Sequence, residues 1–306
     1  MSALLVLCSV LYMTLGAKGS WGFILPFRGQ KLAALLLVGV SVSTATVLFQ
    51  TITQNRILTP SIMGFDALYV LLLTLLVFVL GGQSYVQMPA IGQFLLNTAL
   101  LMGASVALFG TLLGCGRVDL MRMILTGIIL GVLFRSLTGF MQRMIDPNEY
   151  AVIQSGSFAR FTQIDTSLLG ISTLLTLAAL IVVWRVRHRL DVLALGHTAA
   201  VNLGETPKRA TFLVLVLVAL LVSVSTALVG PVAFLGLLVV SLAHLITPTP
   251  RHAILLPSAA LVAMIVLVGG QTILERVLAL STPLSVVVDV LGGLLFLILL
   301  LKGTFR

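Results

Sequence analysis

The sequence has few charged residues, and this scarcity decides its class. Only 9% of its 306 residues are Asp, Glu, Lys or Arg, whereas 59% are hydrophobic. An ordinary soluble domain has roughly a quarter of its residues charged, and a chain so poor in charge cannot cover its apolar surface in water. Apolar runs long enough to cross a hydrocarbon layer of about 30 Å recur along nearly the whole chain. The composition therefore predicts an integral membrane protein.

Several catalytic and metal-binding patterns are also missing. Cys8 and Cys115 lie in separate apolar segments, and neither has a second Cys or a His at metal-ligand spacing. The phosphate-binding pattern G-x-x-x-x-G-K-[ST] does not occur, and the nine acidic residues are dispersed. We find no nucleophile and base pair in the sequence. We therefore expect a chain that is not an enzyme, binds no metal or cofactor and leaves ATP hydrolysis to partner subunits.

The apolar runs predict an all-α polytopic membrane protein with about ten transmembrane helices. Lipid cannot satisfy exposed backbone groups, and runs of this length form helices and not barrel strands. The first run has no preceding basic residue and no clear cleavage site, so we interpret it as a retained span. No intervening stretch could form a soluble core, so residues 1–306 form one expected transmembrane domain. The expected spans are 3–16, 32–50, 62–80, 92–114, 121–143, 168–186, 210–229, 232–246, 254–271 and 284–301.

The basic residues predict the orientation in the membrane. The net charge is +9, but the 18 basic residues are scattered among loops, which does not indicate nucleic-acid binding. With the amino terminus inside, eleven lie on the cytoplasmic side, six lie outside and Arg135 lies within a span, which accounts for all 18. The cytoplasmic set is Arg56, Arg117, Arg122, Arg185, Arg187, Arg189, Lys208, Arg209, Arg251, Lys302 and Arg306. The outer set is Lys18, Arg28, Lys31, Arg143, Arg160 and Arg276.

A polar segment on the cytoplasmic side carries a distinctive pattern. Residues 191–207 read DVLALGHTAAVNLGETP and contain two Leu-Gly steps, which we interpret as a short helix, a turn and a second helix. The segment resembles the loop by which permeases of the FecCD family of binding-protein-dependent importers dock on their ATPase. By this resemblance, the ATPase-coupling residues are Leu195, Gly196, His197, Ala200, Leu203, Gly204 and Glu205.

Three further segments resemble the same family in the same order along the chain. Residues 50–64, QTITQNRILTPSIMG, are similar to a signature after the second span, with the Asn-Arg order exchanged. Residues 230–245, GPVAFLGLLVVSLAHL, are similar to another, with Val-Ser replacing the usual Pro-His. The carboxyl-terminal match consists of Arg276, Pro283, Gly292, Gly293 and Phe296.

The resemblance implies an ABC importer permease of the type II fold in the bacterial cytoplasmic membrane. Such a permease pairs with a second permease subunit, two ATP-binding subunits and a periplasmic or lipoprotein substrate-binding protein. Residues 52–69, ITQNRILTPSIMGFDALY, are most similar to the branch that serves catecholate and mixed-chelate siderophores, in which two different permeases form a heterodimer. The expected cargo is therefore a ferric siderophore.

The same resemblance assigns binding-protein docking to Arg28, Lys31 and Arg276. In the family, outer basic residues meet acidic residues on the binding protein, and such charge pairs steer docking and fix register. The alternative for these residues is ordinary snorkelling at the membrane interface.

By the family resemblance, the fifth and tenth expected spans line the translocation path at the subunit interface, and one helix face of the fifth span is the candidate lining. Gly127, Gly131, Arg135 and Gly139 recur every four residues and share a face, which suits close helix packing. Arg135 adds a charge within a span, where ionisable groups usually face a cavity or a partner. Its expected depth matches that of Asp289 in the tenth span, so we expect it to meet an anionic chelate or to be held by Asp289.

Two alternatives remain open from the sequence. The family resemblance allows cobalamin or haem as the cargo. A ten-span secondary transporter is the alternative from another class, and it requires buried ion-coupling carboxylates. Asp66 and Asp289 are the candidates, but they are not placed symmetrically in the two halves, and Asp66 is expected to cap the third span.

Overall fold

The computed structural model describes residues 1–16, 20–114, 120–161, 164–277 and 284–301. Six residues considered above lie outside the described residues: Lys18, Cys115, Arg117, Pro283, Lys302 and Arg306.

Each apolar run predicted as a span forms a helix, so the all-α fold class is confirmed. These helices are α1 (Ser2–Thr14), α2 (Trp21–Thr53), α3 (Phe65–Leu80), α5 (Ala90–Gly114), α6 (Leu120–Gln142), α8 (Thr166–Leu193), α10 (Pro207–Val229), α11 (Leu235–Ile246), α12 (His252–Thr272) and α13 (Leu284–Leu301). Among the described residues, six helices are long and apolar enough to cross a membrane, and α1, α3, α11 and α13 contribute shorter apolar segments. The chain is thus a multi-pass membrane protein, and the total of ten spans stays a prediction.

Four short elements connect the long helices. They are α4 (Gly82–Gln87), α7 (Pro147–Gly156), α9 (His197–Asn202) and the π-helical turn η1 (Ile273–Val277). The predicted helix, turn and helix within 191–207 was wrong, because α8 itself continues to Leu193 and α9 is a single short helix. The start of α8 is fixed by Asp165, which accepts hydrogen bonds from the Ser167 amide (2.9 Å) and hydroxyl (2.7 Å). These bonds hold the pKa of the Asp165 carboxyl below its usual range.

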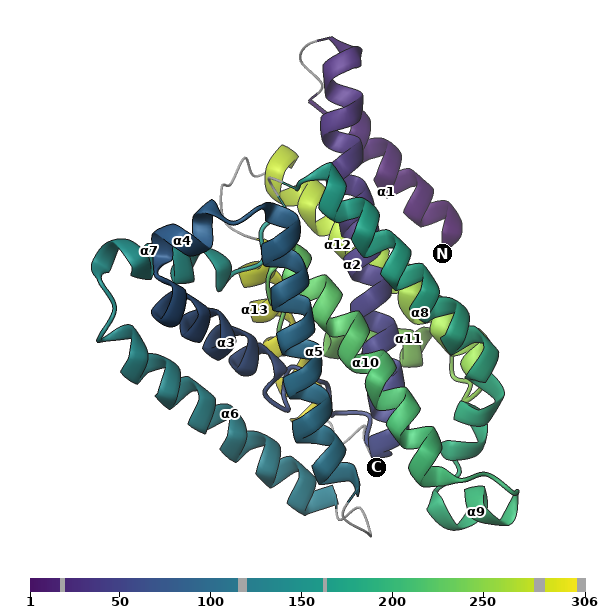
Figure 1. The fold of residues 1–306 in the computed structure, drawn as a ribbon. Helices are drawn as coiled ribbons and strands as arrows, with labels where there is room; N and C mark the ends of the chain where they lie inside the picture. Colours follow the sequence, from purple (N-terminus) through teal and green to yellow (C-terminus); the bar gives the residue numbers. More distant parts are fainter. Residues whose placement is uncertain (17–19, 115–119, 162–163, 278–283, 302–306) are drawn as a thin grey trace.

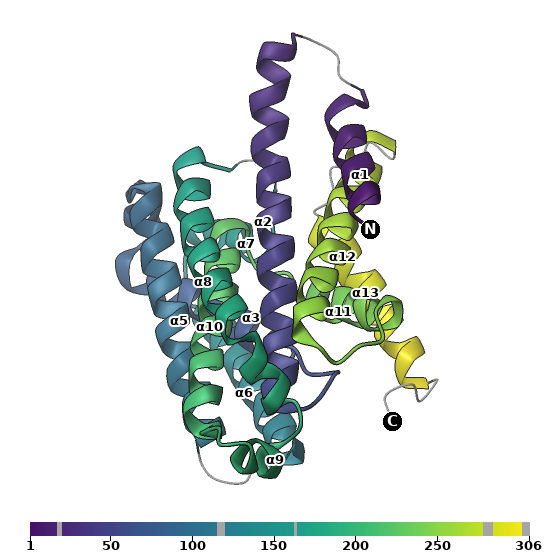
Figure 2. The ribbon, with the colours of Figure 1, turned by 90° about the vertical axis from the view of Figure 1, so that its right-hand side faces the viewer.

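Helix α2 runs through the middle of the bundle. It packs against α12 on one side and α10 on another, while α5 and α8 flank α10 and α1 packs on α12. Figure 1 shows α3 and α6 paired on one side of this centre and α8 on the other, and Figure 2 shows α8 and α12 on opposite sides of α2. Gly39 allows the close packing of α2 and α12, because a Cβ at this position would lie 3.2 Å from the Met264 amide nitrogen.

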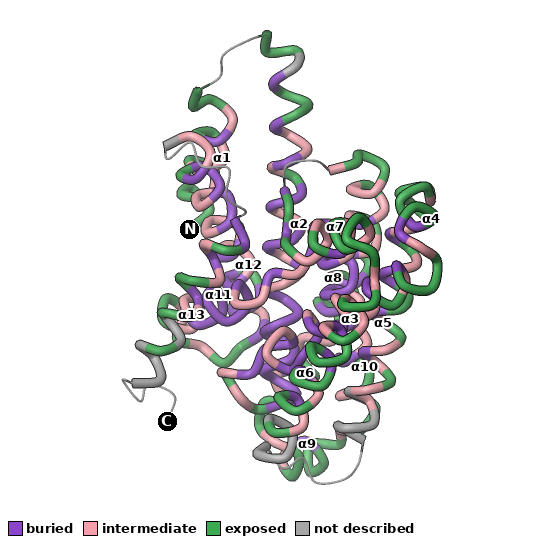
Figure 3. Tube along the Cα trace, turned by 90° about the vertical axis from the view of Figure 1, so that its left-hand side faces the viewer, coloured by how far each residue is buried: buried purple, intermediate pink, exposed green. Residues whose placement is uncertain are grey.

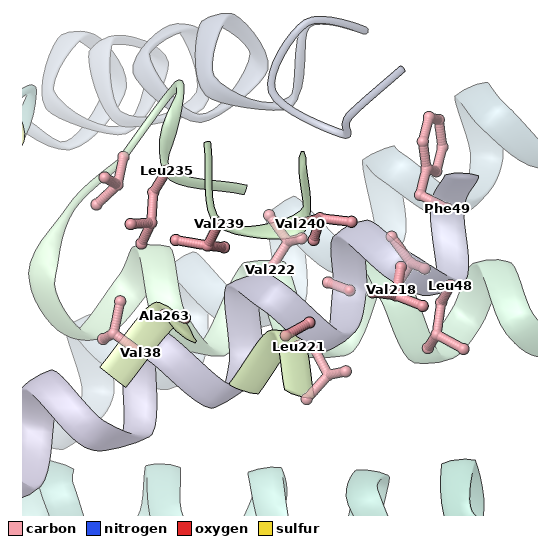
Figure 4. Close-up of a cluster of buried hydrophobic side chains, with 14 of the residues drawn as sticks. Val38, Leu48, Phe49, Val218, Leu221, Val222, Leu235, Val239, Val240 and Ala263 are labelled. Atoms are coloured by element: carbon pink, nitrogen blue, oxygen red, sulfur yellow. The ribbon is translucent and has the colours of Figure 1, made fainter. Parts of the chain in front are cut away.

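The largest group of buried apolar side chains lies where α2, α10, α11 and α12 meet. Figure 4 shows Val38 and Leu48 of α2 in the same cluster as Leu221 of α10 and Val239 of α11. Each of these side chains is fully buried. Figure 3 shows that burial follows the centre of the bundle, whereas Trp21 and Gly22 at the start of α2 are exposed. The bundle therefore provides a packed support from which the shorter segments project.

Helix α11 begins inside the bundle after residues 230–234, which end in a turn at Ala233 and Phe234. Gly230 has φ +102°, and a Cβ there would lie 2.9 Å from the Phe158 carbonyl oxygen. Only glycine fits this conformation and this approach without strain. The Arg160 amide donates to the Val229 carbonyl at 2.7 Å and fixes the same contact. The loop after α7 is thus held against the segment that leads into α11.

Candidate functional site

The segment predicted to contact an ATPase forms a compact projection at one end of the molecule. Helix α9 lies between the end of α8 and the start of α10, beyond the main bundle in both ribbon views (Figures 1 and 2). Gly196 precedes it with φ +100° and Gly204 follows it with φ +83°. These values lie in the region that favours glycine, so both Leu-Gly steps of the sequence are explained by the turns that flank α9.

The side chains of this projection divide between support and exposure. Ala200 is fully buried against the bundle, whereas Leu195 is 64% exposed and Leu203 is 61% exposed. His197 is also exposed. Glu205 accepts an ion pair from Arg189 of α8, with 3.3 Å between Oε1 and Nε. Two large apolar side chains therefore face away from the protein at its polar end, which is typical of a contact surface for another chain.

A buried polar group ties α8 to α2 and α12 just before α9. His252, at the start of α12, bonds Asp191 of α8 through Nδ1 at 2.7 Å and through its amide at 2.8 Å. The other ring nitrogen lies 2.7 Å from the Thr51 hydroxyl of α2. Asp191 therefore satisfies the first amide of α12 from a different helix. Sequence analysis missed this group because its members are 61 and 201 residues apart.

Three of the residues predicted for the translocation path line one open cavity of about 410 Å³. Arg135 and Gly139 come from α6, and Asp289 comes from α13. Asp66, at the start of α3, also lines the cavity. A basic residue and two acidic residues therefore share one cavity between α3, α6 and α13, where charges are typical of a transport path.

Asp289 has partners other than Arg135. Its Oδ1 accepts a hydrogen bond from the Phe234 amide at 3.0 Å, and the Ala233 amide also donates to it. These amides stand at the amino-terminal end of α11, where the helix dipole favours a negative charge. Within the described residues no ion pair joins Arg135 to Asp289. The structure therefore brings both residues to one cavity without pairing them.

The other two glycines of the predicted stripe serve packing. A Cβ on Gly127 would lie 2.5 Å from the Met63 sulfur, and one on Gly131 would lie 3.3 Å from the Arg135 guanidinium. Gly131 also lies against Gly64, where a Cβ would be 3.3 Å from the Gly131 Cα. The stripe thus allows α6 to approach the turn before α3, and Gly139 is the member that lines the cavity.

Asp66 differs from the expected helix cap. Gly64 is the N-cap residue of α3, and Asp66 lies within the first turn. Its carboxylate accepts a hydrogen bond from the Ser61 side chain, and Oδ2 is buried without a hydrogen-bond partner. Asp66 is therefore a cavity residue that the sequence did not separate from an ordinary cap.

Arg28, the first residue predicted to dock a binding protein, is buried. Its guanidinium donates to the carbonyls of Tyr12 (3.1 Å), Met13 (2.8 Å), Leu15 (3.0 Å) and Gly16 (3.1 Å). These carbonyls end α1 and have no intrahelical donors. Arg28 is only 5% exposed, so in this structure it serves as a cap for α1.

The other two predicted docking residues share one acidic partner. Lys31 Nζ lies 3.7 Å from Oε1 of Glu275, and Arg276 Nη2 lies 3.4 Å from Oε2 of the same residue. Lys31 also lies over the Phe27 ring at 4.6 Å. The Arg276 Nε atom is buried without a hydrogen-bond partner. The structure thus brings the predicted cations together at the junction of α1, α2 and η1, where Glu275 is the acidic partner of Lys31 and Arg276.

Comparison with known proteins identifies the family of the chain. The model of the FecCD transport family matches residues 5–302. The chain belongs to the FecCD transport family. The resemblance drawn from the four segments is therefore confirmed.

Individual relatives of this FecCD member are similar over most of their length. The chain is 44% identical to the petrobactin import system permease protein YclO of Bacillus subtilis, over 93% of this chain and 90% of that protein. It is 31% identical to the petrobactin import system permease protein FatC of Bacillus anthracis, over 89% and 77%. Its fold matches a structure described as an inward-facing metal-chelate type ABC transporter, with TM-score 0.83, 23% identity and coverage of 98% and 97%.

Two departures from the FecCD signatures are accommodated by the local structure. Gln50 donates to the Arg56 carbonyl at 2.6 Å, and Asn55 accepts from the Ile57 amide at 2.8 Å. These bonds fold the turn after α2 with Asn and Arg in exchanged order. Val240 and Ser241, which replace the usual Pro-His, are buried inside α11, and the helix continues through them. Neither departure interrupts the fold.

Proposed function

We propose that this FecCD-family chain is the permease subunit of an ABC importer that moves a ferric siderophore across the bacterial cytoplasmic membrane. The observation that carries the proposal is α9, a short helix flanked by the exposed Leu195 and Leu203 at the basic end of a multi-pass bundle. A permease of an ABC importer that lacks a phosphate-binding loop needs a contact of this kind to receive energy from an ATPase subunit. The partners proposed are two ATP-binding subunits, a second and different permease, and a substrate-binding protein.

The siderophore class is supported by the relatives. Both YclO and FatC are named as petrobactin import permeases, so ferric petrobactin is the first cargo to test. Family membership over residues 5–302 favours this importer over a ten-span secondary transporter. The chain itself is proposed to hold no cofactor, because iron arrives as part of the cargo.

The coupling role can be tested in a reconstituted complex. The chain is purified with its candidate permease and ATPase partners in liposomes, and ATP hydrolysis is measured with and without ferric-siderophore-loaded binding protein. The double variant Leu195→Asp, Leu203→Asp is expected to keep the unfolding temperature of the isolated chain and to lose ATPase stimulation, because charged groups replace the apolar contact. Gln83→Asp adds a charge on exposed α4 and is the control. If ATP hydrolysis in the complex with the double variant were stimulated as strongly as with the wild type, the role of α9 would be refuted.

The cavity gives a second and separate test. Arg135 is the basic residue that lines it, and an anionic chelate gains from a fixed positive charge inside the membrane. Arg135→Ala is expected to reduce uptake of the radiolabelled ferric siderophore at least about tenfold, the loss of about 1.4 kcal/mol of interaction, while assembly with the ATPase persists. Arg143→Ala, an exposed arginine just beyond α6, is the control. Undiminished uptake by Arg135→Ala would remove Arg135 from the path.

A further inference from the structure

A second cavity, of about 440 Å³, opens between α2, α8 and α12. It lies on a different part of the bundle from α3 and α6, which carry residues of the cavity that holds Arg135 (Figure 1). Its wall is almost entirely apolar, with Val40 of α2, Leu177 and Ile181 of α8, and Ala260 of α12 among the lining residues. Leu177 and Ile181 are each more than half exposed. We call this cavity the α8 groove.

The length of α8 indicates at which depth in the membrane the α8 groove lies. Its 28 residues span about 42 Å at about 1.5 Å per residue, which exceeds a hydrocarbon layer of about 30 Å. If Thr166 lies at the outer boundary of that layer, Arg185 lies about 28 Å further along the helix, at the inner boundary. The apolar wall therefore lies at the depth of the acyl chains, and Arg185 lies at the level of the inner headgroups.

Arg185 closes the inner end of the α8 groove with a charge. It lines the groove together with Trp184, and within the described residues its side chain has no hydrogen bond or ion pair. Arg187, by contrast, folds back on Trp184, with its guanidinium 4.4 Å from the ring centre and a 3.1 Å hydrogen bond to the Trp184 carbonyl. Tryptophan is typical of the membrane interface, which agrees with the depth inferred from helix length.

We propose that the α8 groove binds an anionic phospholipid of the cytoplasmic leaflet, with an acyl chain along the apolar wall and the headgroup phosphate on Arg185. A guanidinium binds phosphate oxygens in bidentate fashion, and basic pockets between helices at the cytoplasmic side suit anionic headgroups. In a zwitterionic lipid the attached ammonium offsets the phosphate charge. Tight binding of an anionic lipid therefore uses both the apolar wall and Arg185. The proposal does not depend on the cargo of the transporter.

The position of the α8 groove connects the lipid to the coupling end. The same three helices are joined by the bonds of His252 to Asp191 and to Thr51. A lipid that fills the groove braces α8 against α2 and α12 on the membrane side of this polar group. We therefore expect a bound anionic lipid to make the end of α8 that carries α9 more rigid.

The experiment uses the purified chain in detergent after delipidation. Phosphatidylglycerol and phosphatidylcholine with identical acyl chains are titrated, and bound lipid is counted by native mass spectrometry beside the unfolding temperature. Wild type is expected to prefer phosphatidylglycerol about fivefold, the contribution of one basic residue at the surface of an anionic membrane. Arg185→Gln is expected to abolish this preference and to retain weak binding of both lipids, while Arg143→Gln, altered at the other end of the molecule, keeps it.

A second variant tests the apolar part of the site. Ala260→Trp fills the α8 groove from α12, and it is expected to reduce binding of both lipids while Arg185 remains. Equal affinity of wild type for the two lipids, or an unchanged preference in Arg185→Gln, would overturn the proposal. A wild-type mass that shows a second copy of the chain and no bound lipid would also overturn it, because the groove would then be a protein interface.

Discussion

The inner and outer ends of the molecule were both predicted as contact surfaces, but the structure treats their residues differently. At the inner end, Leu195 and Leu203 are exposed on either side of α9, and Ala200 is the residue of α9 that is buried. At the outer end, Arg28 and Lys31 are buried and bound to groups of the chain itself. Glycine-flanked turns direct the leucines outward, whereas the long basic side chains fold back onto carbonyls and a carboxylate. The family resemblance predicted both surfaces, but the exposure of their residues depends on partners that lie far away in the sequence.

The largest expected effect is at Arg28. Arg28→Met removes the donor to four carbonyls at the end of α1, and we expect the free energy of unfolding in detergent to fall by about 3 kcal/mol. Chemical denaturation of the purified chain measures this loss, with Arg143→Met as the exposed control. If stability were unchanged and only the affinity for the binding protein fell, Arg28 would belong to the docking surface after all.

Asp191 is expected to have the largest effect at the inner end. Asp191→Ala leaves the first amide of α12 and the ring of His252 without their acceptor, so the free energy of unfolding should fall by about 2 kcal/mol. Asp146→Ala changes an exposed acidic residue with no side-chain cap bond and should have little effect. Equal unfolding curves for the two variants would show that the inner end is not anchored by this group.

Substitution of Glu275 tests how far Lys31 and Arg276 depend on their shared carboxylate. Glu275→Gln removes the charge that Lys31 and Arg276 share, and we expect a loss of about 1.5 kcal/mol in the free energy of unfolding. The same variant should raise the dependence of binding-protein affinity on salt, since two cations lose their internal partner. An unaltered salt dependence, measured by surface plasmon resonance, would mean that neither cation reaches the binding protein.

The glycine turns of the inner end should be sensitive to a single methyl group. Gly204→Ala places a side chain at φ +83°, and we expect a loss of about 1 kcal/mol in the free energy of unfolding. Gly103→Ala is the matched control, because Gly103 lies inside α5 with open space around its added Cβ and should be stabilised. The unfolding temperatures of the two variants are compared with that of the wild type. Shifts of the same sign in both variants would show that the turn at Gly204 is not strained by a side chain.

The smallest effect is expected at Arg189. Its ion pair with Glu205 is exposed on the Arg189 side by 62%, so Arg189→Ala should change the free energy of unfolding by less than about 0.5 kcal/mol. The measurement is the same denaturation series. A loss as large as that of Glu275→Gln would show that the inner end, like the outer one, depends on its charges for stability.

The sequence predicted the long helices because their apolar runs are a direct consequence of the membrane as solvent. It placed the start of α2 too late, at residue 32 and not at Trp21, because Arg28 and Lys31 read as loop residues when their partners are not visible. It missed α4 and α7, which are short and partly polar. The expected depths of Arg135 and Asp289 in their helices were enough to predict that the two residues lie near one another. The place of Asp66 in the cavity and the contact between Asp191 and His252 depend on tertiary packing, which the sequence does not reveal.

Helix α8 has a mechanical consequence. It is one uninterrupted helix from Thr166 to Leu193, and α9 is attached directly at its end (Figure 1). A rod about 42 Å long that tilts by roughly 5° about one end moves its other end by roughly 4 Å. If α8 pivots as a rigid body near α9, a tilt of this size carries Thr166 by about the width of a side chain, so we expect motion at α9 to be transmitted along the whole length of α8.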